Sequence, residues 1–88
     1  MDQQKKKIYY IVMILDQFAK SKNITIKNAY NYLSQFGGLS FLIDHYEAEH
    51  LLSEDEVLED LDAISRRGGG AIWSLYTMVQ TLLLKILI

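Results

Sequence analysis

Both histidines and most of the acidic residues lie within residues 39–62, so this stretch is where metal or acid–base chemistry would be expected. A zinc site on a single helix needs two histidines four positions apart. His45 and Glu49 have that spacing and could share a helix face, but His50 follows His45 by five positions and is turned away. The chain also has no cysteine. The sequence therefore predicts no metal site and no cofactor.

Nine of the eleven acidic residues fall between Asp44 and Asp62. Paired carboxylates catalyse acid–base reactions only where a cleft gives them environments that separate their pKa values. A dense acidic helix face is normally solvated, although it also suits a basic partner because complementary charge speeds association. We therefore expect no enzymatic activity. We interpret the stretch as a protein-recognition surface in which acidic rim contacts surround an aromatic anchor. The candidate partner-binding residues are Asp44, Tyr46, Glu47, His50, Glu59 and Asp60.

Nucleic-acid and phosphate binding find little support. The three glycines at 68–70 follow a predicted helix rather than opening one, and they lack the Lys and Ser/Thr of a phosphate loop. The tyrosines are not interleaved with basic residues, as a base-stacking surface would require. The net charge is −2, and a helix over residues 40–49 would set carboxylates against DNA phosphates.

The elements that position these residues are all expected to be helices, because the chain has no proline and no alternating strand pattern. Residues 4–22 form an apolar stripe at helical spacing, widened by neighbouring apolar residues, which predicts a central helix buried on more than one side. That stripe comprises Ile8, Ile11, Val12, Leu15, Phe18 and Ala19, and Tyr9, Tyr10, Met13 and Ile14 widen it. Asn23 is expected to end this helix.

Three further helices are predicted before residue 70. Thr25 is a good N-cap for residues 26–36, which would bury Ile26, Ala29, Tyr30 and Leu33, and Gly37-Gly38 would end this helix. Residues 40–49 form the next helix, with Phe41, Leu42, Ile43 and Tyr46 toward the core. Ser53 and Glu56 have the spacing of a capping box, which starts a last helix that buries Val57, Leu58, Leu61 and Ile64 and stops at the triple glycine.

The final segment, residues 71–88, has one charge, Lys85, and ends in an apolar run. A membrane-spanning helix needs about twenty apolar residues, and polar residues interrupt this one. We expect a hydrophobic helix that packs on the bundle or on another chain; an exposed tail or a membrane anchor is an alternative. The predicted organisation is a compact all-α bundle of four helices over residues 1–70, plus the C-terminal helix at 71–88.

The chain resembles a small bacterial family of unknown function over about residues 5–70. The resemblance is carried by Asp44-His45-Tyr46-Glu47-Ala48-Glu49-His50, by Glu59-Asp60-Leu61 and by Arg66-Arg67-Gly68-Gly69. The Y-x-x-L helix at Tyr30 to Leu33 and the Ile-, Val- and Tyr-rich first helix belong to the same pattern. No catalytic role is known for these motifs. Members tend to be encoded beside small ADP-ribosyltransferase-like proteins, an arrangement similar to toxin–antitoxin pairs.

The resemblance and the acidic stretch together imply a non-enzymatic, cytoplasmic protein that binds and restrains an ADP-ribosyltransferase-like partner encoded next to it. Two alternatives stay open: a structural module that self-associates through residues 71–88, and an adaptor tethered to a membrane by the same segment. A cytoplasmic location is the expectation, because no signal-peptide cleavage site follows the first apolar run.

Overall fold

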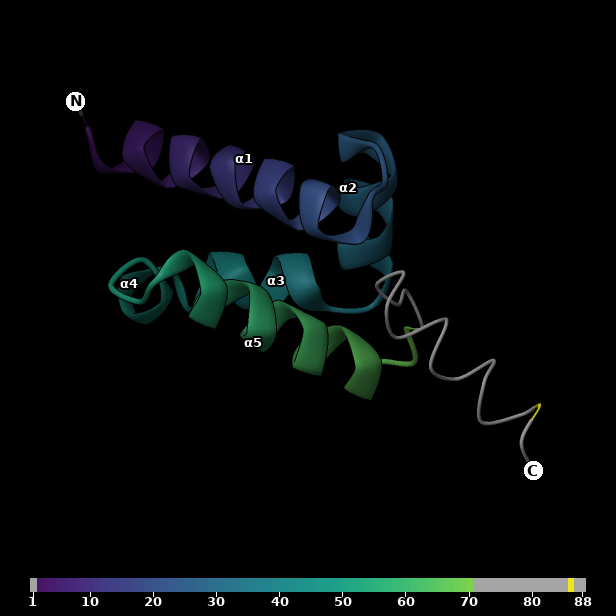
Figure 1. The fold of residues 1–88 in the computed structure, drawn as a ribbon. Coiled ribbons are helices and arrows are strands. Elements are labelled where there is room, and N and C mark those ends of the chain that lie inside the picture. The colour runs from purple at the N-terminus through teal and green to yellow at the C-terminus, as the bar shows by residue number, and fades with distance from the viewer. Residues whose placement is uncertain (1, 71–85, 87–88) are drawn as a thin grey trace.

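The structure of the protein is a computed structural model, in which residues 2–70 and residue 86 are described; the predicted tail helix at 71–88 lies outside the described residues apart from Ile86. Five α-helices follow one another in these residues: α1 Gln3–Lys22, α2 Ile26–Gln35, α3 Gly38–Asp44, α4 Tyr46–Glu49 and α5 Glu54–Arg67. No strand occurs within residues 2–70, and the predicted all-α class is confirmed. Figure 1 shows α1 lying alongside α3 and α5, with α2 at its C-terminal end.

The helix ends follow the local signals in the sequence. Thr25 Oγ1 accepts a hydrogen bond from the Asn28 N–H at 3.1 Å and starts α2. Ser53 Oγ accepts one from the Glu56 N–H at 3.2 Å, which is the predicted cap of α5. Asn23 adopts a left-handed conformation with φ 56° and ends α1, as its side chain permits.

Two predicted boundaries are wrong. The helix expected over residues 40–49 is divided into α3 and α4 at His45, whose φ of −109° and ψ of 23° leave the helical region. Gly38 does not end α2 but is the first residue of α3, and Gly37, with φ 88°, is the N-cap of that helix. The bundle therefore has five helices before residue 70 rather than four.

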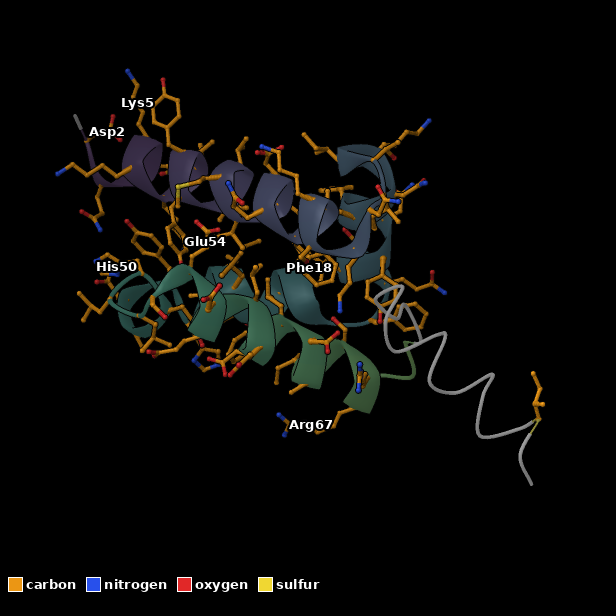
Figure 2. The ribbon with its side chains drawn as sticks, in the orientation of Figure 1. Asp2, Lys5, Phe18, His50, Glu54 and Arg67 are labelled. Carbon is orange, nitrogen blue, oxygen red and sulfur yellow. The ribbon has the colours of Figure 1, made fainter. Side chains whose placement is uncertain are left out.

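The core lies where α1, α2, α3 and α5 meet, and Phe18 points into it from α1 (Figure 2). Its rings are in contact, with Phe18 stacked on Tyr32 at a centroid distance of 6.1 Å. The buried apolar residues are Ile14, Leu15, Phe18, Ala19, Ala29, Tyr32, Leu33, Leu42, Val57 and Leu61. Burying an aliphatic or aromatic side chain of this size contributes roughly 1.5–3 kcal/mol, so these contacts hold the helices in place.

Part of the predicted core is exposed. On α1, Ile8, Tyr9, Val12 and Met13 keep 54%, 64%, 52% and 47% of their surface exposed, so this helix is not buried on several sides. On α2, the structure buries Tyr32 instead of Ile26 and Tyr30, which are 48% and 50% exposed. The exposed apolar residues Ile8, Tyr9, Val12 and Met13 are called the α1 strip below.

Candidate functional site

The six predicted partner-binding residues differ in how far they are exposed. Asp44, Glu47, His50 and Glu59 are exposed and Asp60 is half-buried, as an acidic rim would require. Tyr46, however, keeps only 6% of its surface exposed, because other rings of the molecule cover it. Its side chain therefore leaves little area for a partner to contact, and we do not retain it as the aromatic anchor.

Tyr46 belongs to a ring cluster at the α4 end of the molecule, formed by Tyr10, Tyr46 and His50. The Tyr46 and His50 rings stack at 4.6 Å between centroids, and the Tyr10 ring meets Tyr46 edge-on at 5.4 Å. His50 Nδ1 lies 2.9 Å from the Tyr46 carbonyl oxygen, so this nitrogen carries a proton and donates to the carbonyl. Figure 2 shows His50 at this end, far from Arg67 at the end of α5. The ring cluster fixes α4 against α1.

Metal binding receives no support from this geometry. His45 packs against Phe41 at 4.8 Å between centroids, away from the stack that holds His50. Within residues 2–70, no group of three His, Cys, Asp or Glu side chains is placed to hold an ion.

The acidic residue that stands out is Glu49, which was absent from the predicted set. Only 5% of its surface is exposed, and burial is the main reason that its pKa rises to about 7. A hydrogen bond with the Asp60 side chain and the negative charges of Asp60 and Glu56 raise it further. Burial beside Glu49 and Tyr46 likewise raises the pKa of Tyr10 to about 12. The sequence does carry a signal for this position, because Glu49 follows Leu42 and Tyr46 at helical spacing.

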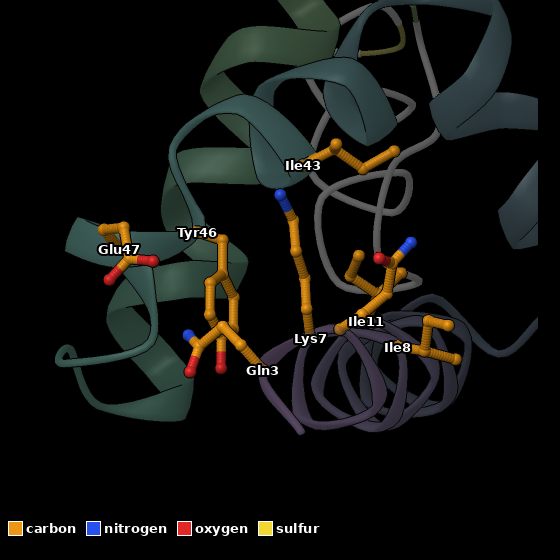
Figure 3. A pocket seen from close by; sticks show the side chains of 8 residues that line it. Gln3, Lys7, Ile8, Ile11, Ile43, Tyr46 and Glu47 are labelled. Carbon is orange, nitrogen blue, oxygen red and sulfur yellow. The ribbon is translucent and has the colours of Figure 1, made fainter.

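A groove of about 480 Å³ separates the N-terminal half of α1 from α3 and α4 (Figure 3). Apolar side chains contribute to its lining, notably Ile11, Ile8 and Ile43, the last two 54% and 39% exposed. Charged and amide groups form its rim, where Lys7 extends from α1 toward the α3–α4 side and its Nζ lies 5.7 Å from the centre of the Tyr46 ring. The lining residues are Gln3, Gln4, Lys7, Ile8, Ile11, Ile43, Tyr46 and Glu47. This groove is called the α1–α3 groove.

Glu59 lies elsewhere, in a shallower hollow of about 310 Å³ between the end of α1 and α5. Asp62 on the same wall pairs with Lys22 at 3.0 Å and with Arg66 at 3.1 Å, so the basic residues here are already engaged. Tyr46 and Glu47 therefore share the α1–α3 groove, whereas Glu59 faces a separate, ion-paired region. Chemically, the groove can seat an apolar side chain and pair with a charged neighbour.

The expectations for the tail cannot be placed on this geometry, since residues 71–85, 87 and 88 lie outside the described part of the chain. No helix within the described residues is long and apolar enough to cross a membrane.

Comparison with known proteins adds a family. No curated protein and no solved structure matches the chain. A family model does match, over residues 9–66, which include most of α1 and all of α2 to α4. That match covers the ring cluster, Glu49 and the exposed acidic residues, and it shows that the chain belongs to the family described as "Protein of unknown function (DUF3791)".

Proposed function

We propose that this chain is a non-enzymatic, cytoplasmic interaction module that binds and restrains a partner protein, in the manner of an antitoxin. The observation that carries the proposal is the α1–α3 groove, whose lining exposes isoleucines that a folded protein often buries. Exposed apolar surface with a polar rim is typical of a site that receives another protein.

The charged residues around the groove would orient a bound partner. Glu47 and the neighbouring Asp44 are exposed on the α3–α4 side, and within residues 2–70 neither forms an ion pair. A partner with a basic residue next to an apolar side chain would contact the apolar lining and pair with the rim at once. Rim pairs mainly speed association, whereas the apolar anchor sets the lifetime of the complex.

The nature of the partner rests on the resemblance to proteins encoded beside small ADP-ribosyltransferase-like proteins. An inhibitor of such an enzyme needs only to hold it or cover its site. It needs no catalytic groups of its own. We therefore propose the ADP-ribosyltransferase-like product of the neighbouring gene as the protein that is bound.

Co-expression of the two genes, followed by affinity purification and a growth assay, tests the proposal. We expect a stable complex and relief of toxicity. Ile43→Glu in the groove lining should weaken the complex by roughly tenfold or more, as loss of an interface anchor does. Ile26→Glu is the matched control, because Ile26 is similarly exposed at 48% but does not line the groove. The proposal fails if no complex forms or if both substitutions act alike.

The α1 strip favours a second candidate function, a self-associating structural module. Four large apolar side chains lie on one side of α1, and a second copy of the chain could bury them. The oligomeric state of the full chain, of a chain ending at Gly70 and of a Val12→Glu variant would show which surface, if any, mediates self-association. Loss of an oligomer on truncation at Gly70 would implicate residues 71–88, whereas loss only with Val12→Glu would implicate the α1 strip. A monomer in all three would exclude this function.

A further inference from the structure

The Glu49 side chain occupies an unusual position, because this carboxyl on α4 keeps only 5% of its surface exposed. Its Oε2 is shielded from solvent and accepts no hydrogen bond from the residues described. A buried carboxylate without donors costs several kcal/mol, so a stable fold requires either a counter-ion or a proton.

The groups around Glu49 do not include a counter-ion. From α5, Asp60 and Glu56 face it, and both carry negative charge when ionised. From α1, Tyr10 faces it, with a hydroxyl that has no partner among the described residues. Within α4 itself, His50 is stacked on Tyr46 and its Nδ1 is bonded to a backbone carbonyl. Lys7 of α1 lies over the Tyr46 ring, and Glu49 forms no ion pair within residues 2–70.

Glu49 and Asp60, the carboxyl pair, lie within hydrogen-bonding reach of each other. Two carboxylates only accept hydrogen bonds, so this contact exists only when one of them is protonated. We propose that the carboxyl pair is a proton-dependent fastening of α4 to α5, which holds when Glu49 carries the proton and donates to Asp60, and is released when Glu49 ionises. Because Tyr46 on α4 lines the α1–α3 groove, release also alters the wall of that groove. This inference goes beyond the proposed function and needs no partner.

The direction of the pH effect follows from linkage. Burial and the neighbouring Asp60 and Glu56 raise the pKa of Glu49 from its ordinary value of 4.5 to about 7 in the fold, so the folded chain binds this proton more tightly than the unfolded chain does. The proton on Glu49 makes its full contribution to the free energy of unfolding below pH 4.5. This contribution declines as the pH rises from 4.5 to 7 and is lost above pH 7. Neutral pH is therefore close to the midpoint of release.

Urea unfolding at several pH values between 4.5 and 8 tests the proposal with the isolated full chain. We expect the unfolding midpoint of the wild type to fall across this range more steeply than that of Glu49→Gln, whose amide can donate to Asp60 at every pH. The variant should also exceed the wild type in stability at pH 8. Glu47→Gln is the matched control, because it removes an exposed carboxylate from the same helix, and its profile should parallel that of the wild type.

A second measurement on the wild type alone guards against a variant that does not fold. Side-chain carboxyl signals of Glu49 in a carbon-13 NMR titration should move with a midpoint near 7, and the Tyr46 ring signals should shift with the same midpoint. A Glu49 midpoint near 4.5, or Tyr46 signals that do not follow Glu49, would overturn the proposal. Neither result depends on whether a partner binds, so this inference and the proposed function can fail separately.

Discussion

Gly68 makes a contact that no other residue type permits. It caps α5 with an ordinary φ of −79°, so its backbone conformation alone would accept any residue. An added Cβ, however, would overlap the carbonyl oxygen of Phe36 and lie 3.1 Å from the carbonyl carbon. Since both sides of this contact are backbone, neither can rotate out of the way. The end of α5 and the end of α2 would have to separate.

Gly37 provides the contrasting case. Its φ is 88°, which strains any side-chain residue, but no atom lies within 4 Å of an added Cβ. Gly37→Ala should cost about 1–2 kcal/mol from the left-handed backbone, and Gly37→Asn less, because Asn tolerates this region. Gly68→Ala should cost about 1–3 kcal/mol by overpacking, and Gly68→Asn at least as much, because the longer side chain meets the same carbonyl. At Gly37 we therefore expect Ala to lose more stability than Asn, whereas at Gly68 we expect Asn to lose at least as much as Ala.

Urea unfolding at a single pH would measure these differences. An 88-residue chain is expected to have a total stability of about 4–13 kcal/mol, so losses of this size are a measurable part of it. The reasoning is refuted if Gly68→Ala costs less than about 0.5 kcal/mol, the range of surface substitutions. It is also refuted if Asn is better tolerated than Ala at Gly68.

Three further substitutions test the core, a cap and an ion pair by the same unfolding assay. Leu42→Ala, at a fully buried site, should cost about 2–5 kcal/mol, whereas Leu51→Ala, at a site 77% exposed, should cost little; equal losses would contradict the described core. Ser53→Ala should cost about 1 kcal/mol and Ser53→Asp should not, because Asp also caps helices. Asp62→Asn should cost about 1 kcal/mol by weakening the pairs with Lys22 and Arg66, and a loss that does not shrink in high salt would argue against ion pairing.

The sequence predicted best where structure is decided within a few residues. Asn23, Thr25 and Ser53 act through their own backbone neighbours, so their roles follow from residue type and position. The all-α class followed equally from helical spacing and the absence of proline.

The sequence predicted burial less well, because burial depends on which helices pack against each other. Residues 8–15 of α1 are almost all apolar, so periodicity alone cannot tell that Ile14 and Leu15 face the core while Val12 and Met13 face outward.

Burial within the candidate site was also not predicted from the sequence. Glu49 is absent from the predicted site residues, although its spacing from Leu42 and Tyr46 places it on their buried face. The packing of the fold buries this carboxyl despite its preference for water, and the burial raises its pKa.

The ion pair between Lys22 and Asp62 also bears on how quickly the chain assembles. These residues stand forty positions apart (62 minus 22), whereas α1 and α2 are joined by only residues 23–25. Closing a long loop costs more entropy than closing a short one, so we expect α1 and α2 to pair early and α5 to dock late. Substitutions at the α1–α5 contact would then raise the unfolding rate and leave the refolding rate almost unchanged. We therefore expect the detachment of α5 to be the first motion that exposes the core during unfolding.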